Sequence, residues 1–165
     1  MISDRLANKL NEQIQVEFQS EAYYLGMAAY FEEEDWDGFA HFMKLQAEEE
    51  HEHGMKFFDF LAEVDRPIDV PAVEAPRTDY SSIREVFETA LEQEQHVTQK
   101  IHELVSLSRE ESDYEAESIL QWFVDEQIEE ENTMDSLLSQ VKRAEGDEAA
   151  LFMIDRELAQ REDEE

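Results

Sequence analysis

The sequence predicts an all-α protein: a four-helix bundle with one long crossover connection and a short fifth helix at the C-terminus. Three observations support this fold class. Apolar residues recur at spacings of three and four through four long stretches, which is the period of an amphipathic α-helix. All three prolines are gathered between positions 64 and 80, and only four glycines interrupt the chain of 165 residues. So few turn-forming residues exclude an all-β domain with many turns.

Two of the long predicted helices lie in the first half of the chain and two in the second half. They cover about residues 3–33, 36–63, 82–110 and 113–144. Ser3 is a suitable N-cap for the first helix, and Ser82 with Glu85 forms a capping box for the third. A short fifth helix follows at about residues 147–160. We expect residues 1–165 to form a single domain, as is usual for this length. The charged tail REDEE should be solvated.

The proline-containing segment, about residues 64–80, is the predicted crossover. Proline removes a backbone donor and disfavours helix at the preceding residue, so this segment should be extended. An extended segment of about 17 residues can reach on the order of 50 Å, whereas a helix of 30 residues is about 45 Å long. The crossover can therefore run the length of the bundle. It would make the second and third helices parallel and each half of the chain an antiparallel hairpin.

The charge balance excludes several classes of function. Lys plus Arg number 13 and Asp plus Glu number 44, which gives a formal net charge of −31. We therefore expect no nucleic-acid partner, and an anionic membrane surface would repel the chain. Leu, Ile, Val and Phe make up about 24% of the residues, above the roughly 20% typical of disordered chains. The excess of acidic residues is typical of a protein surface adapted to high salt.

The sequence shows no signal for export, for a membrane span or for thiol chemistry. Its longest apolar run, residues 23–31, is much shorter than the roughly 18 residues that suggest a membrane span. The N-terminal stretch MISDRLANKLNEQ lacks the apolar region of a signal peptide. The absence of cysteine excludes disulfides, zinc fingers and iron–sulfur clusters. We therefore expect a cytoplasmic protein.

Each of the four long predicted helices carries a glutamate on the apolar stripe that should face the core. These residues are Glu17, Glu50, Glu94 and Glu130. Each lies near the midpoint of its helix, so all four would meet in one layer whichever way the helices point. Buried ionised carboxylates are very costly if unpaired, and the stripes contain no lysine or arginine. Cations can neutralise them. His53, three residues after Glu50, adds an imidazole that suits iron or manganese better than calcium or magnesium.

Chance is the alternative explanation for any single stripe glutamate in so acidic a chain. Four glutamates at matched depth, with a histidine at the spacing for shared ligation, favour a metal site. Tyr24, one heptad after Glu17, can bond a ligand or donate an electron, and an ordinary core tyrosine is the alternative. Trp122, beside the fourth stripe, has the same two explanations. The remaining histidines have no partner at comparable spacing and are expected to be surface or structural residues: His41, His51, His96 and His102.

Five stretches, in this order, resemble a bacterial non-haem ferritin over nearly the whole chain. They are KLNEQIQVEF, AEEEHEHGMKFFDFL, EQEQHVTQKIHELV, ILQWFVDEQIEEE and FMIDREL. The resemblance implies a ferritin-like bundle with two iron ions per subunit. By this resemblance Glu17, Glu50 and His53 would bind the first iron. Glu50, Glu94 and Glu130 would bind the second, so that Glu50 bridges the pair.

The resemblance assigns further residues around this centre. Gln127 matches a position beside the second iron, and Tyr24 matches a tyrosine adjacent to the centre. The additional glutamates of a third iron site match Glu49, Glu126 and Glu129, with Glu130 shared. Haem is not expected. Bacterioferritin carries a second Glu-x-x-His on the fourth helix, where this chain has Thr133, and Glu52 stands at the position of the haem-ligating methionine.

The activity implied by the resemblance is that of a ferroxidase. Such a protein oxidises Fe(II) with dioxygen or hydrogen peroxide and deposits Fe(III) mineral in a hollow homo-oligomeric shell of 24 subunits. The main alternative is a di-iron carboxylate oxidase or a peroxide-scavenging enzyme without a storage role, although substrate oxidases usually carry Glu-x-x-His on two helices. A DNA-protecting mini-ferritin would lack the fifth helix. A purely structural acidic bundle would leave the buried glutamates unexplained.

Overall fold

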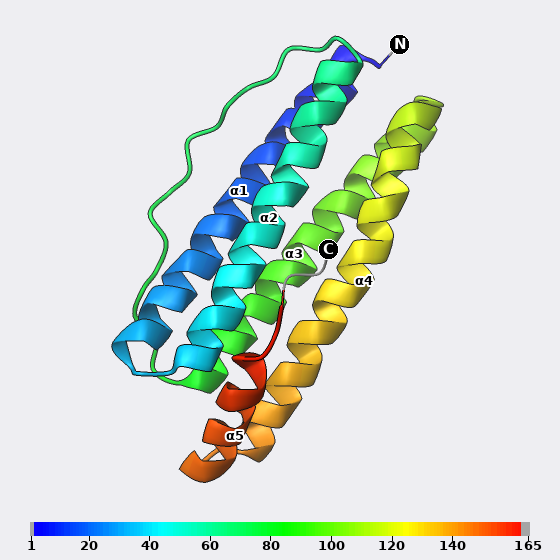
Figure 1. Cartoon of the computed structure of the whole chain (residues 1–165). Coiled ribbons are helices and arrows are strands. Elements are labelled where there is room, and N and C mark those ends of the chain that lie inside the picture. Colours follow the sequence, from blue (N-terminus) through cyan, green and yellow to red (C-terminus); the bar gives the residue numbers. More distant parts are fainter. Residues whose placement is uncertain (1, 163–165) are drawn as a thin grey trace.

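The chain folds into four long helices and a short fifth helix, as the computed structural model of residues 2–162 shows (Figure 1). The helices are α1 (Asp4–Glu33), α2 (Asp37–Glu63), α3 (Ile83–Glu110), α4 (Tyr114–Arg143) and α5 (Glu148–Leu158). α1 and α2 form one antiparallel hairpin, α3 and α4 form another, and α2 and α3 run in the same direction (Figure 1). The all-α fold class with one long crossover is confirmed. Within the described part of the chain, no helix is long and apolar enough to cross a membrane.

Polar side chains cap the N-termini of four of these helices by accepting a hydrogen bond from a first-turn amide. The capping residues are Ser3, Ser82, Asp113 and Asp147. The capping box predicted for Ser82 and Glu85 is only half correct. Ser82 accepts from the Glu85 amide, but the Glu85 carboxylate accepts from the amide and hydroxyl of Ser81, at 2.6 and 2.8 Å. These bonds, together with Arg77, lower the pKa of Glu85 to about 2.

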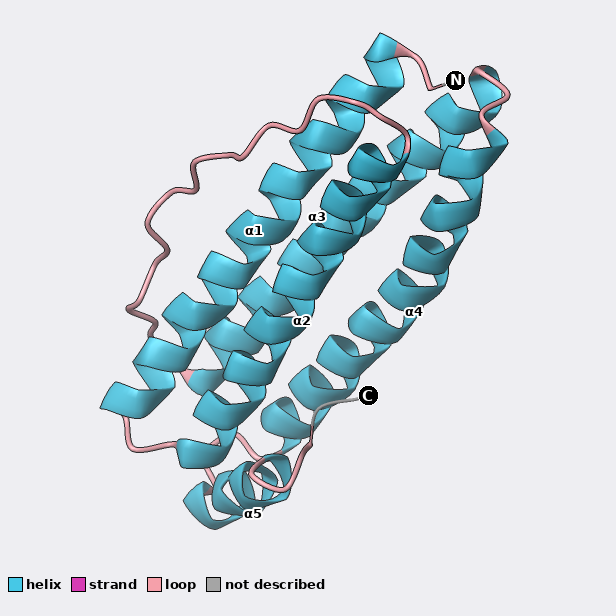
Figure 2. Cartoon of the chain, turned by 45° about the horizontal axis from the view of Figure 1, so that its top comes forward, coloured by secondary structure: helices cyan, strands magenta, loops and turns pink. Residues whose placement is uncertain are grey.

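The crossover runs along α1 in extended form from one end of the bundle to the other (Figure 2). Two amide side chains of α1 fasten it by donating and accepting at the same time. Asn11 donates to the Pro67 carbonyl at 2.9 Å and accepts from the Asp69 amide at 2.8 Å. Gln19 donates to the carbonyl of Glu74 at 3.1 Å and accepts from its amide at 2.8 Å. These bonds satisfy backbone groups that an extended segment leaves unpaired.

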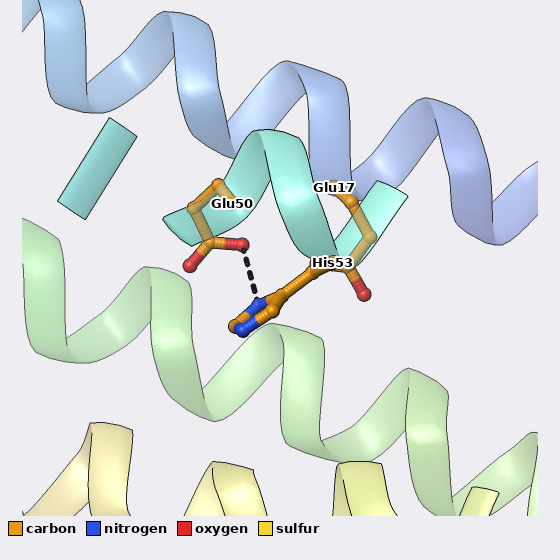
Figure 3. Close-up of side chains that lie close together, drawn as sticks. All are labelled: Glu17, Glu50 and His53. Carbon is orange, nitrogen blue, oxygen red and sulfur yellow. Dashed lines mark ion pairs between the residues drawn. The ribbon is translucent and has the colours of Figure 1, made fainter. Parts of the chain in front are cut away.

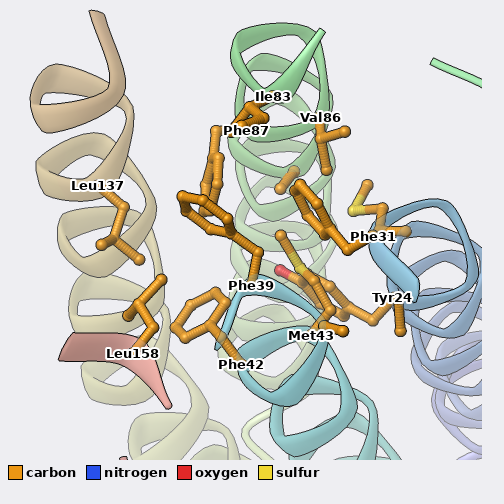
Figure 4. Close-up of a cluster of buried hydrophobic side chains, with 14 of the residues drawn as sticks. Tyr24, Phe31, Phe39, Phe42, Met43, Ile83, Val86, Phe87, Leu137 and Leu158 are labelled. Atoms are coloured by element: carbon orange, nitrogen blue, oxygen red, sulfur yellow. The ribbon is translucent and has the colours of Figure 1, made fainter. Parts of the chain in front are cut away.

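The core consists of two apolar clusters, one toward each end of the bundle. The first cluster is rich in aromatic rings, including Phe31 and Phe39, whose centroids lie 5.1 Å apart (Figure 4). The second cluster lies at the other end and includes Phe57 stacked on Phe123 at 4.1 Å. On every long helix, the predicted stripe glutamate falls between the residues of the first cluster and those of the second. The polar layer is therefore enclosed by apolar side chains on both sides.

α5 packs across the start of α2, where the N-cap residue Trp36 makes no side-chain capping bond. Buried Asp155 of α5 supplies that bond from outside the helix by accepting from the Phe39 amide at 2.9 Å. Gly38 permits this contact, because a Cβ at that position would lie only 1.7 Å from the Asp155 carbonyl oxygen. Leu158 completes the docking by packing into the first apolar cluster.

Candidate metal centre

Five ionisable side chains meet in the middle of the bundle, one each from α1, α3 and α4 and two from α2. They are Glu17, Glu50, His53, Glu94 and Glu130, and each is at most 4% exposed. Figure 3 shows Glu17, Glu50 and His53 gathered beside α2, on the side toward α3. Because the helical period places Glu50 and His53 on one face of α2, their side chains point into the same space.

These side chains form two groups of potential ligands that share Glu50. In the first, one atom each of Glu17, Glu50 and His53 lie within 4.8 Å of one another. In the second, the same holds for Glu50, Glu94 and Glu130. His53 Nδ1 lies 3.5 Å from a carboxylate oxygen of Glu50, the pair joined by a dashed line in Figure 3. The geometry thus offers two adjacent positions for cations with one carboxylate between them.

Glutamine amides donate hydrogen bonds to three of the four glutamates. The pairs are Gln13 with Glu17 (2.8 Å), Gln46 with Glu130 (2.9 Å) and Gln127 with Glu94 (3.1 Å). Glu94 also accepts from the Tyr24 hydroxyl. Each of these amides contributes a dipole but no charge, so the negative charge of the layer is left for cations to neutralise.

Glu50 is the exception, because neither of its buried carboxylate oxygens has a hydrogen-bond donor. One oxygen of Glu17 and Nδ1 of His53 are also buried without a partner. A buried polar atom without a partner costs free energy and is uncommon in folded proteins. In this layer the unpartnered atoms all belong to the ligand group of Glu17, Glu50 and His53, and they are carboxylate oxygens and an imidazole nitrogen, which can bind metals. The arrangement is one that could hold metal ions.

Burial is the main cause that raises the pKa of each glutamate in the layer above its ordinary value. The effect is largest for Glu50 and Glu130, where the negative charge of Glu94 is the next cause. Burial also raises the pKa values of Glu17 and Glu94, against the opposing effect of His53 and Gln13 at Glu17 and of the Tyr24 and Gln127 hydrogen bonds at Glu94. The glutamates of the layer therefore hold protons more tightly than exposed glutamates do, and metal ions that bind compete with those protons.

His53 is oriented by a second carboxylate. Its Nε2 lies 3.6 Å from a carboxylate oxygen of Glu126, one turn before Glu130 on α4. Burial would lower the pKa of His53, but Glu126 and the negative charges of Glu17 and Glu130 outweigh it and raise that pKa. A carboxylate on one ring nitrogen fixes the tautomer that presents the other nitrogen to a metal. Glu126 thus favours Nδ1 as the ligand atom.

Comparison with known proteins identifies the family. Residues 7–144 match the ferritin family, described as a ferritin-like domain. The chain belongs to the ferritin family. It is 38% identical over 161 residues to the bacterial non-heme ferritin of Staphylococcus aureus (strain USA300), covering 98% of this chain and 97% of that protein. The corresponding protein of Staphylococcus epidermidis is 39% identical over the same length.

Solved ferritin structures superpose closely on this ferritin. The open pore ferritin of the hyperthermophilic archaeon Archaeoglobus fulgidus matches with a TM-score of 0.97 and 38% identity, covering 98% of this chain and 100% of that one. A humanized archaeal ferritin matches with a TM-score of 0.98 and 36% identity over the full length of both chains. The predicted resemblance to bacterial non-haem ferritins and the ferritin-like fold are confirmed.

The additional glutamates predicted for a third iron site are only partly brought together in this ferritin. Glu126 and Glu130 form a group of potential ligands with His53. Glu49 pairs with Arg161 at 2.9 Å, and Glu129 is exposed. Among the described residues, neither Glu49 nor Glu129 joins a group of three potential ligands.

Tyr24 and Gln127 lie beside the centre, both in contact with Glu94. Trp122 packs edge-on against His53, with ring centroids 5.5 Å apart, and remains partly exposed. The other histidines lie outside the layer. His51 stacks on Phe18, for example, with ring centroids 5.5 Å apart.

The charged tail contains a residue that reaches toward the layer and that the sequence did not predict. The expectation that residues 161–165 are solvated is wrong for Arg161, whose guanidinium donates to Gln46 and Glu49. Residues 163–165 lie outside the described part of the chain. Gln13 and Gln46 also bond glutamates of the layer, and their place as polar residues on an apolar stripe is a signal that can be read from the sequence. Arg161 has no such signal, because it follows the last helix.

Proposed function

We propose that this ferritin oxidises Fe(II) at two adjacent positions on either side of Glu50 and stores the Fe(III) product as a mineral. The observation that carries the proposal is the position of Glu50. Both of its oxygens lack donors, and it belongs to both ligand groups. Glu17 and His53 would complete the first iron position, and Glu94 and Glu130 the second. Gln127 would remain beside the second iron.

The charges of the layer fit a pair of divalent ions. Four ionised carboxylates carry four negative charges, which balance two Fe(II) ions. Oxidation to two Fe(III) adds two positive charges and favours hard anionic oxygen ligands such as carboxylate and hydroxide. The four carboxylates therefore neutralise the charge of two Fe(III) ions less completely than that of two Fe(II) ions, and hydroxide from water must bind the oxidised ions as well. This imbalance favours departure of the oxidised iron toward a mineral.

The reaction balances when two ferrous ions act together. Each Fe(II) gives up one electron, and dioxygen takes up two electrons and two protons to form hydrogen peroxide. If hydrogen peroxide is the oxidant, two electrons and two protons yield two waters. The protein's part is to hold both ions at once on Glu50, with His53 oriented by Glu126. Tyr24 would keep the Glu94 carboxylate in place by donating to it.

Storage requires a container as well as a centre. We propose that residues 1–165 form one domain that assembles into a homo-oligomeric shell of 24 cytoplasmic subunits. The ferritin names of the relatives and the near-complete coverage in both directions support this proposal. Glu49, Glu126 and Glu129 would form the third iron position, on the route from the centre to the cavity. Their location on α2 and α4, beside Glu50 and Glu130 in sequence, supports that role.

Titration of Fe(II) in air tests the proposal. Oxidation that continues well beyond the number of binding positions, with the iron retained in the assembled protein, supports storage. Oxidation that stops at two irons per chain would favour the alternative of a di-iron oxidase or peroxide-scavenging enzyme.

Two variants test the residues. Glu50→Ala removes the shared ligand, so rapid oxidation should fall by orders of magnitude while far-ultraviolet circular dichroism still shows a helical protein. Glu129→Ala is the matched control on α4. It should leave the first two-iron oxidation intact and alter only later turnover. If Glu50→Ala oxidises iron at the wild-type rate, the proposed centre is wrong.

A further inference from the structure

The chain does not end at α5 but turns back along the bundle, as Figure 1 shows. Residues 159–162 form this return segment, within the described part of the chain. The segment is held against one face of α2. His41 Nε2 lies 2.7 Å from the Arg161 carbonyl oxygen, and the Arg161 guanidinium lies over the Phe42 ring at 4.7 Å.

The guanidinium of Arg161 reaches from this segment to two polar side chains of α2. It donates to Gln46 Oε1 at 2.8 Å and to Glu49 Oε1 at 2.9 Å. The side chains of Arg161 and Glu49 are 21% and 25% exposed, so the pair is partly shielded from water. Hydrogen bonds between charged groups in such a setting are among the stronger ones in proteins.

The contact with Gln46 connects Arg161 to the buried layer. An amide that accepts at its oxygen must present its nitrogen elsewhere, and Gln46 Nε2 donates to Glu130 at 2.9 Å. Arg161 therefore fixes which end of Gln46 faces the centre. The same guanidinium puts its positive charge beside the Glu49 carboxylate. The third iron position would need that carboxylate as a ligand.

We propose that Arg161 holds the place of a third metal ion: its guanidinium competes with that ion for Glu49, so the return segment must move before the ion can bind. This inference rests on the proposed function and adds a control on it. A carboxylate cannot give the same oxygen fully to a guanidinium and to a metal ion. The two-ion centre therefore fills first, and the third position is filled at the expense of the Arg161 contacts.

A purely structural role is the competing explanation, in which Arg161 only fastens the return segment. Both explanations predict a loss of thermal stability on substitution. They differ in metal binding. If Arg161 only fastens the return segment, it leaves the affinity for a third ion unchanged. If Arg161 competes with the ion for Glu49, it weakens that affinity.

The experiment is anaerobic titration of the assembled protein with Fe(II) in a calorimeter. The variants are Arg161→Gln, Glu49→Gln and the double variant. Arg156→Gln is the matched control, because Arg156 lies on α5 over Phe152 and makes no contact with Gln46 or Glu49. We expect Arg161→Gln to tighten binding of a third ion by about tenfold, the order expected for removing one charged hydrogen bond. The first ion, on Glu17, Glu50 and His53, should bind as in the wild type, and the double variant should lose the gain.

Two results would overturn the inference: an unchanged third-ion affinity in Arg161→Gln, or a gain that persists without Glu49. Hydrogen exchange gives an independent readout. Saturation with the third ion should speed hydrogen exchange in residues 159–162 of the wild type but not of Glu49→Gln. Equal exchange in the two proteins would also contradict the inference. Failure of the proposed function looks different, because Glu50→Ala would then still bind the first two ions as tightly as the wild type.

Discussion

Replacing Glu50 by glutamine measures what the buried carboxylate costs the metal-free protein. Glutamine keeps nearly the same volume, so no cavity forms, and it removes the ionisable group. Burial, followed by the negative charges of Glu94, Glu17 and Glu130, raises the pKa of Glu50 well above its ordinary value of 4.5. We therefore expect metal-free Glu50→Gln to be more stable than the metal-free wild type at pH 8.

The sign follows from proton linkage. A carboxyl whose pKa is raised by folding binds its proton more tightly in the folded state. It therefore contributes stability below its unfolded pKa and loses that contribution as the pH rises through its folded pKa. The advantage of Glu50→Gln should be small near pH 4.5 and grow as the pH rises above that value. Two buried oxygens without donors cost about 1–3 kcal/mol. At about 2–4 °C per kcal/mol for a chain of this size, the midpoint should rise by about 2–12 °C.

Thermal unfolding followed by circular dichroism at pH 5 and pH 8, with chelator present, provides the measurement. Glu129→Gln is the control, since it removes one exposed carboxylate from α4. Adding Zn(II) should reverse the order, because a ligand at 100 times its dissociation constant stabilises the wild type by about 2.7 kcal/mol per site. The reasoning is refuted if Glu50→Gln is the less stable protein at pH 8 without metal, or if metal leaves the order unchanged.

Three further predictions concern the scaffold and the shell. Asp155→Ala removes the acceptor for the Phe39 amide and should lower the free energy of unfolding by about 0.5–2 kcal/mol. Hydrogen exchange should show α5 and the first turn of α2 opening together. Continued protection of that turn in the variant would contradict this. Gln19→Leu removes both bonds to Glu74, so limited proteolysis should cut the crossover several-fold faster, whereas an unchanged rate would mean that Asn11 alone holds it. The proposed shell should loosen at about 0.01 M salt, where the Debye length is roughly 30 Å, and recover near 1 M, where it is about 3 Å. Light scattering with chelator present checks this, and one constant size across the series would show that apolar contacts outweigh the repulsion.

The sequence alone was sufficient to predict the fold class and the layer of glutamates. Both depend on helical periodicity, which places Glu17, Glu50, Glu94 and Glu130 at one depth whatever the details of packing. The location of the layer between two apolar clusters follows from the same pattern, because apolar residues continue each stripe on both sides.

The details that periodicity could not supply depend on side-chain conformation and on contacts distant in sequence. Gln46 stands on its stripe, but its donation to Glu130 requires a particular amide orientation that Arg161 sets from the far end of the chain. The second half of the predicted capping box is wrong for a similar reason. The Glu85 carboxylate accepts from the amide of Ser81, one residue before the N-cap, in a turn that no spacing rule specifies.

The division of ligands between the two hairpins has a consequence for how the protein comes together. Glu17, Glu50 and His53 all belong to the α1–α2 hairpin, whereas Glu94 and Glu130 belong to the α3–α4 hairpin. A first ion can thus be held by one half of the chain, but a second ion on Glu50, Glu94 and Glu130 must join both halves. Such an ion acts as a removable cross-link that closes a long loop, as a disulfide does in chains that contain cysteine. Loss of iron from the second position would remove this cross-link and leave the two apolar clusters, which both hairpins share, to hold the halves together.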